Sequence, residues 1–159
     1  MANLIYVTIK GKTQGLISAG CSTLESIGNK YQAGHQDQIM ALAFEHTLTR
    51  EENVNHGPVS FVKPIDKSSP LLGIAISDNE CLELEFLFYR TSSSGINELY
   101  YSVKLTKAYI YRINIIIPHA IDHSSKQPEE MITVKYQSIS WSHRTAGTSG
   151  YSIWDERVY

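Results

Sequence analysis

Two histidines four residues apart have the most chemically suggestive spacing in the sequence. His119 and His123, with Asp122 before the second, are spaced like two zinc ligands on one face of a helix. Pro118 precedes the pair and a polar stretch ending in Pro128 follows it, which favours a loop. The acidic residue is Asp where the zinc-protease motifs have Glu. We therefore expect solvated loop histidines and no metal, and we keep a small metallohydrolase using His119 and His123 as an alternative function.

Two further motifs resemble catalytic or ligand-binding signatures. Residues 11–13, Gly-Lys-Thr, look like the end of a phosphate-binding loop, but Tyr6 stands where that motif needs a glycine. Cys21 and His35 could form a thiol–imidazole pair only if the fold brought them together, and free cysteines more often pack in cores. We reject the first motif and treat Cys21 as a packing residue.

Acidic and hydroxyl residues give no catalytic site either. Glu83 and Glu85 look like the paired carboxylates of a glycosidase, yet the alternation around them indicates the solvent-facing side of a strand. Residues 147–150, Gly-Thr-Ser-Gly, lack the strand-to-helix context of a nucleophilic serine. We expect no enzyme and no cofactor.

Composition indicates one globular domain rich in sheet. The chain has 159 residues, 42% hydrophobic and 19% charged, with ten tyrosines. A net charge of -2 and 14 scattered Lys and Arg residues argue against nucleic acid. No stretch approaches the ~20 apolar residues of a membrane helix, and the N-terminus resembles a strand rather than a signal peptide. Cys21 and Cys81 are too few for a disulfide framework, and their redox state stays open.

A strand–helix–strand unit at residues 59–90 is the strongest structural signal. Ser69 is the expected N-cap and Pro70 the first-turn residue of the helix. The pattern ends before Asn79, which tolerates the left-handed conformation of a helix end. We expect one helix, about Ser69–Ser77, whose core face consists of Leu71, Leu72, Ala75 and Ile76.

Alternation predicts strands before and after this unit. Residues 4–9 indicate a buried strand, residues 16–38 irregular chain with one short strand at most, and residues 40–48 a strand with one wet face. Residues 98–117 alternate over a length that requires one bent strand or two strands joined at residues 106–108.

The last third of the chain contains a loop and a change of phase. Residues 118–128 are a loop by composition, and the apolar phase after it reverses near Gln137 and Ser138, which indicates a bulge. About seven to nine strands with one helix favour a mainly β fold, a β-barrel of two sheets with the short α-helix packed at its side.

Two surfaces are expected to make contacts. Residues 49–58 are a polar loop longer than a tight hairpin needs, and Val54 alone would hold it down, so it should project. Its candidate contact residues are Arg50, Glu51, Glu52, Asn53, Val54, Asn55 and His56. The second half of residues 98–117 is apolar on both faces and, like the aromatic tail, needs a cover that other copies could supply. The subunit-contact candidates are Tyr109, Tyr111, Ile113, Ile115, Trp154 and Tyr159.

Four separated motifs occur in one order along the chain. They are Asn3-Leu4-Ile5-Tyr6, the block Lys63-Pro64-Ile65-Asp66-Lys67-Ser68-Ser69-Pro70-Leu71-Leu72, Phe88-Tyr89-Arg90, and Ser140-Trp141 followed by Ala146-Gly147-Thr148-Ser149-Gly150-Tyr151. Together they closely resemble the Hcp family (haemolysin-coregulated protein) of type VI secretion systems, and the resemblance covers essentially the whole chain.

The resemblance implies a structural role. Members of the family form hexameric rings that stack into an inner tube, which a contracting sheath drives out of the cell. Partners would be other copies, the sheath and spike proteins, and small effector proteins in the channel, with assembly in the bacterial cytoplasm and export without a signal peptide. Residues 49–58 would contact the neighbouring ring, and residues 1–159 would be a single tube domain without the toxin domain of some relatives. A freestanding secreted β-barrel binding module is the other alternative.

Overall fold

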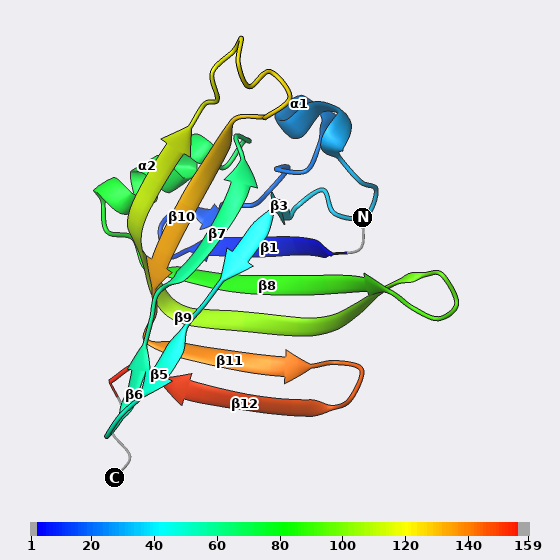
Figure 1. The fold of residues 1–159 in the computed structure, drawn as a ribbon. Coiled ribbons are helices and arrows are strands. Elements are labelled where there is room, and N and C mark those ends of the chain that lie inside the picture. The colour runs from blue at the N-terminus through cyan, green and yellow to red at the C-terminus, as the bar shows by residue number, and fades with distance from the viewer. Residues whose placement is uncertain (1–2, 156–159) are drawn as a thin grey trace.

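Two antiparallel sheets share one long strand (Figure 1). The computed structural model describes residues 3–155. One sheet runs β2-β1-β8-β9-β11-β12 and the other β9-β10-β7-β4. The strands are β1 (Leu4–Gly11), β2 (Gly15–Leu16), β3 (Ile39–Ala41), β4 (Ala43–Glu45), β5 (Leu48–Arg50), β6 (Val54–His56), β7 (Val59–Pro64), β8 (Leu82–Thr91), β9 (Asn97–Ile116), β10 (Glu129–Lys135), β11 (Ser138–His143) and β12 (Thr148–Ile153). The helices are α1 (Leu24–Ile27), the 3-10 turn η1 (Gly28–Lys30) and α2 (Ser69–Ser77).

Strand β9 belongs to both sheets because it bends at Lys107. Its first half pairs with β8 and β11, and its second half pairs with β10. Lys107 has a φ of 49°, in the left-handed region that non-glycine residues rarely adopt. Opposite the bend, the Gln137 N–H donates to the carbonyls of Thr106 at 3.1 Å and Lys107 at 3.2 Å. Of the two alternatives, the structure has one bent strand. The predicted bulge near Gln137 is wrong. β10 ends there, and β11 begins in the other sheet.

The single strand expected at residues 40–48 is wrong. Instead β3 pairs with β1, β4 pairs with β7, and β5 leaves both sheets. Between β3 and β4, the Leu42 N–H donates to the Val62 carbonyl at 2.6 Å. Leu42 and Leu48 are exposed, so the expected apolar face does not form. Residues 39–45 thus link the free sides of the two sheets, and the predicted two-sheet barrel is confirmed, although its ladder does not close completely.

The inward faces of the two sheets enclose one apolar core. Each fully buried Leu, Ile or Phe contributes roughly 1.5–3 kcal/mol. Aromatic rings meet edge to face across the core, with Phe44 4.9 Å and Phe61 5.2 Å from Phe86, centroid to centroid. The largest fully buried apolar members are Ile9, Ile17, Ile39, Phe61, Leu72, Leu82, Leu84, Phe86, Leu105 and Ile132. Tyr6 is also fully buried, in a separate small cluster with Leu4 and Met40.

Helix α2 has the predicted bounds and covers part of this core. Leu72 and Ala75 are buried, and Leu71 and Ile76 pack against the same cluster, whereas Pro70 is exposed. The predicted N-cap is wrong by one residue, because Ser68 occupies that position without a side-chain cap.

The Ser69 hydroxyl belongs to a buried ionic cluster that fastens α2 to the barrel. It accepts a hydrogen bond from the Asp66 N–H at 3.0 Å and donates to Glu130 at 3.0 Å. At the centre, the fully buried Lys63 ammonium lies 2.6 Å from Glu130 and 3.1 Å from Asp66. The residues of the Lys-Pro-x-Asp-Lys-Ser-Ser-Pro block are therefore held in place by buried charge pairing.

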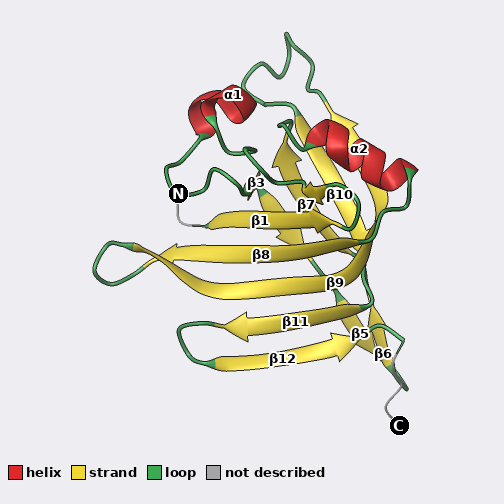
Figure 2. Cartoon of the chain, turned by 180° about the vertical axis from the view of Figure 1, so that it is seen from behind, coloured by secondary structure: helices red, strands yellow, loops and turns green. Residues whose placement is uncertain are grey.

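A second helical segment was not expected from the sequence. α1 and η1 occupy part of residues 16–38, where irregular chain was expected, and they bury none of their side chains. Ile27 alone packs, partly buried, against Leu4, Tyr6 and Met40, and one such residue leaves no apolar period in the sequence. α1 and α2 lie at the end of the molecule opposite to β5 and β6 (Figure 2).

Candidate assembly surfaces

Strands β5 and β6 form a small hairpin, here called the arm (residues 48–56). Its three residue pairs are Leu48 with His56, Thr49 with Asn55, and Arg50 with Val54. Among the described strands these two pair only with each other, and Figure 1 shows the arm extending beyond the two sheets. The segment predicted to be a projecting polar loop does project, and it is a hairpin.

The tip of the arm is polar and exposed. Glu51 and Glu52 are exposed, and Arg50 turns back to donate to the Glu52 carbonyl at 3.3 Å. Asn53 is partly buried, and its side-chain oxygen has no hydrogen-bond partner in the structure. Asn55 faces solvent. The tip thus offers two carboxylates and the Asn55 amide to whatever lies against it.

The root of the arm is fastened by side chains rather than by strand pairing. His46 Nε2 and His56 Nδ1 lie 2.7 Å and 2.9 Å from the Tyr136 hydroxyl, which itself donates to the Gly57 carbonyl at 3.2 Å. Trp154 stacks on His56 with a centroid distance of 5.5 Å. The sequence offered Val54 alone to hold the segment down and gave no sign of this root, because the root residues are far apart in the chain and only the fold brings them together.

Burial keeps the root uncharged near neutral pH. Desolvation lowers the pKa of His56 and, together with the neighbouring His56 charge, that of His46. Desolvation also raises the pKa of the Tyr136 hydroxyl. At neutral pH all three side chains are therefore uncharged.

The subunit-contact candidates on β9 do not share one face. Tyr109 and Tyr111 are exposed on the outside, with Lys135 4.3 Å over the Tyr111 ring. After Tyr111 the β9–β10 pairing shifts by one residue, opposite Thr133 and Val134. Ile113 is therefore half-buried against the core. The bend and this shift each change which side chains of β9 face outward, so residues that alternate in one phase in the sequence lie on different faces.

The far end of β9 carries more exposed apolar surface than expected. Ile115, Ile116 and Ile117 are 56%, 53% and 69% exposed, and Ile121 on the following loop is 83% exposed. Among the terminal candidates, Trp154 is half-buried in the root of the arm, and Tyr159 lies outside the described residues. This isoleucine-rich end lies opposite the arm (Figure 1).

Polar residues cover the outer face of the larger sheet. Glu83 pairs with Lys104 at 3.4 Å, and Glu85 pairs with Arg144 at 3.1 Å. Both carboxylates thus serve as the partly exposed acids of surface ion pairs rather than as an acid and base pair.

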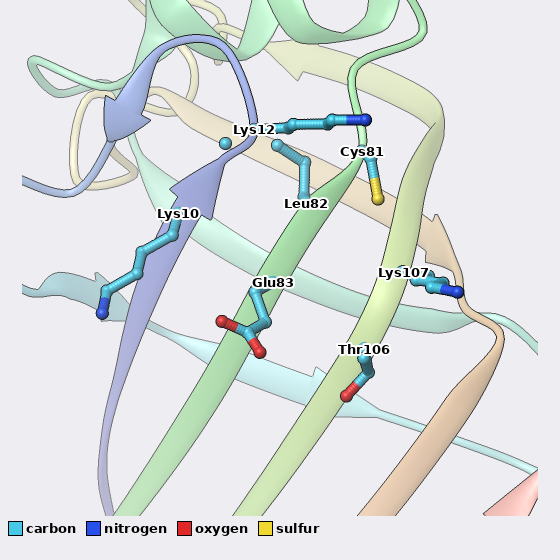
Figure 3. Close-up of a pocket in the computed structure, with 8 residues that line it drawn as sticks. Lys10, Lys12, Cys81, Leu82, Glu83, Thr106 and Lys107 are labelled. Carbon is cyan, nitrogen blue, oxygen red and sulfur yellow. The ribbon is translucent and has the colours of Figure 1, made fainter.

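A shallow pocket of about 280 Å³ opens beside Cys81, at the start of β8 (Figure 3). Lys12 and Lys107 reach it from adjoining segments, and Lys10 points away from the thiol in Figure 3. Contact with Cys81 raises the pKa of Tyr109.

Cys21 is buried, and desolvation, aided by the Asp66 charge, raises its thiol pKa to about 11.

The histidines singled out in the sequence have structural roles in the fold. His119 Nδ1 accepts the N–H groups of Ile121 at 3.2 Å and Asp122 at 3.0 Å, so it caps an exposed turn. His35 stacks on Tyr6 at 3.9 Å, away from the thiol–imidazole geometry considered for it. Within residues 3–155 no group of three His, Cys, Asp or Glu side chains could hold a metal. No helix in the same range is long and apolar enough to cross a membrane.

The geometry defines a β protein whose distinctive features are surfaces: a projecting arm, an isoleucine-rich opposite end and a polar outer sheet. Residues 6–143 match the family described as "Type VI secretion system effector, Hcp". The chain is similar to the "Major exported protein" of Pseudomonas aeruginosa, with 37% identity over 99% of both chains.

Solved structures agree with the sequence comparison. A "Crystal structure of Hcp protein" aligns with a TM-score of 0.92 and 38% identity, covering 98% of this chain and 99% of that one. "Secreted protein Hcp3 from Pseudomonas aeruginosa" aligns with a TM-score of 0.88 and 38% identity over 98% and 100%. The chain belongs to the Hcp family of type VI secretion systems.

Proposed function

We propose that the protein is a structural subunit of the type VI secretion inner tube. Copies associate into hexameric rings, the rings stack, and small effector proteins travel in the channel. Residues 1–159 act as one tube domain without catalytic activity. The observation that carries the proposal is the arm, a hairpin that pairs with no other described strand and presents its exposed tip away from the barrel.

Exposed apolar side chains support association between copies. Tyr111, Ile116 and Ile117 are each more than half exposed, and large contiguous apolar surface on a small protein marks an interaction site. A heterologous contact repeated around an axis closes a ring if the rotation allows, and stacked rings make a tube. Tyr109, Tyr111, Ile113, Ile115, Trp154 and Tyr159 are the proposed subunit contacts.

The remaining partners follow from family membership. The contractile sheath and the spike proteins would act on the outside and end of the tube, which assembles in the cytoplasm before export. Export agrees with the name "Major exported protein" of the Pseudomonas aeruginosa relative.

Native mass spectrometry and secretion assays of an arm deletion test this proposal. Removing residues 51–55 shortens the hairpin without touching the core, so rings should still form while stacking and secretion fail. A matched deletion in the β8–β9 turn, residues 93–95, should leave both intact. A chain that is monomeric at high concentration would contradict the proposal and favour a freestanding binding module.

A further inference from the structure

The root of the arm contains one hydroxyl shared by two imidazoles. The Tyr136 hydroxyl has a single proton, and the Gly57 carbonyl at 3.2 Å accepts it. His46 Nε2 and His56 Nδ1 must then both donate to the hydroxyl oxygen, at 2.7 Å and 2.9 Å. His56 Nε2, which carries no proton in that tautomer, accepts from the Ser152 hydroxyl at 2.9 Å. The network assigns a neutral tautomer to each ring and uses both lone pairs and the proton of the shared hydroxyl.

This cluster holds both legs of the arm. His46 precedes β5 and His56 ends β6, so each leg carries one of the imidazoles. Tyr136 lies between β10 and β11, in the rigid crossing opposite the β9 bend. A two-stranded hairpin with three residue pairs is marginal by itself. The direction in which the arm points therefore depends on the root.

We propose that His46, Tyr136 and His56 position the arm for contact with the neighbouring ring, and that acidification releases it by placing two cations on one hydroxyl oxygen. This inference rests on the proposed tube function. Its occupant is a second copy of the chain, and its signature is ring stacking that depends on pH.

The surroundings give little compensation for added charge. Burial lowers the pKa of His56 and of His46, and the His56 charge lowers that of His46 further. A hollow beside Tyr136 and Trp154 is lined by two cations, Lys107 and Lys135, by the Tyr109 hydroxyl, and by Asp155, the single acid among its described lining residues. Glu45, next to His46 on β4, is exposed.

The direction of the pH effect follows from these charges. Because both imidazoles bind protons less readily in the intact root than in a released one, protons favour release. The root should hold above about pH 6.5, the ordinary histidine value, and weaken below it.

Hydrogen exchange of the wild-type chain tests the root directly. Amide exchange at residues 47–57, divided by the intrinsic rate at each pH, should rise at least about tenfold from pH 7.5 to pH 5.0, while β7 stays constant. A His46→Gln, His56→Gln double variant should lose this pH dependence. His119→Gln, on the exposed turn at the opposite end, should retain it. Equal exchange of the wild-type arm at both pH values would overturn the proposal.

Two further measurements separate positioning from stability. In a Trp141→Phe background Trp154 is the single tryptophan, and its emission should change with a midpoint below pH 6.5 because His56 stacks on it. Tyr136→Phe keeps the ring and removes the hydroxyl, so arm exchange should be fast at both pH values with the barrel unchanged. An arm that remains protected in Tyr136→Phe would overturn the positioning role.

Sedimentation connects the root to assembly. Stacked rings should be present at pH 7.5 and separate into single rings at pH 5.0. Stacking that is equal at both pH values contradicts the inference. If no rings form at either pH, the proposed tube function is refuted. The exchange data then test only whether the root releases the arm on acidification.

Discussion

Replacing Lys63 by methionine should be among the most destabilising single changes in the chain. The Lys63 ammonium is fully buried and lies 2.6 Å from Glu130, 3.1 Å from Asp66, 3.1 Å from the Pro64 carbonyl and 3.2 Å from the Ser69 hydroxyl. Methionine keeps the apolar stem but leaves two buried carboxylates without a cation. Removing one partner of a buried ion pair costs about 3–5 kcal/mol. At about 2–4 °C per kcal/mol for a chain of this size, the melting temperature should fall by about 6–20 °C.

Urea denaturation at one fixed protein concentration measures this change. Lys104→Met is the matched control, because Lys104 pairs with Glu83 at 3.4 Å with both side chains about half exposed, and its loss should cost less than about 1 kcal/mol. A triple variant, Lys63→Met with Asp66→Asn and Glu130→Gln, should recover part of the loss since no buried charge remains. The reasoning fails if Lys63→Met costs no more than Lys104→Met, or if the triple variant is no more stable than the single one.

Three further changes test other parts of the structure. Leu72→Asp buries a carboxylate under α2 and should lower the free energy of unfolding by roughly 3 kcal/mol or more, whereas Ile74→Asp on the exposed side should change it by less than about 0.5 kcal/mol. Tyr111→Glu should reduce the ring fraction in native mass spectra without lowering the melting temperature of the subunit, and undiminished rings would remove Tyr111 from the contact. Because burial lowers the pKa of His46 and His56, the unfolded chain binds more protons below about pH 6.5. The free energy of unfolding should therefore fall on acidification, by at most about 1.4 kcal/mol per unit of pKa difference, and a rise would contradict the burial argument.

Local patterns in the sequence were sufficient for the elements that depend on local physics. The bounds of α2 follow from Pro70, the apolar face and Asn79, whose φ of 49° is the left-handed value expected there. The extent of β9 follows from an alternation that continues over about 20 residues, and its one interruption, at Lys107, is where the strand bends.

Features that depend on distant pairing could not be predicted in the same way. Residues 40–48 alternate like one strand, but β1 and β7 take successive pieces of it into different sheets. His56 belongs to a polar loop by sequence, and its burial depends on Tyr136 and Trp154, 80 and 98 positions later. Lys63 carries no sign in the sequence that its ammonium lies in the core, because Glu130 supplies the second carboxylate from β10.

The mass of the purified protein in native spectra tests the central claim most directly. If copies of this chain cover each other's exposed tyrosine and isoleucine surface, the main species at neutral pH should have six times the 17.9 kDa mass of the chain, with ring-shaped particles in electron micrographs. A single 17.9 kDa species that persists at high concentration would contradict the account.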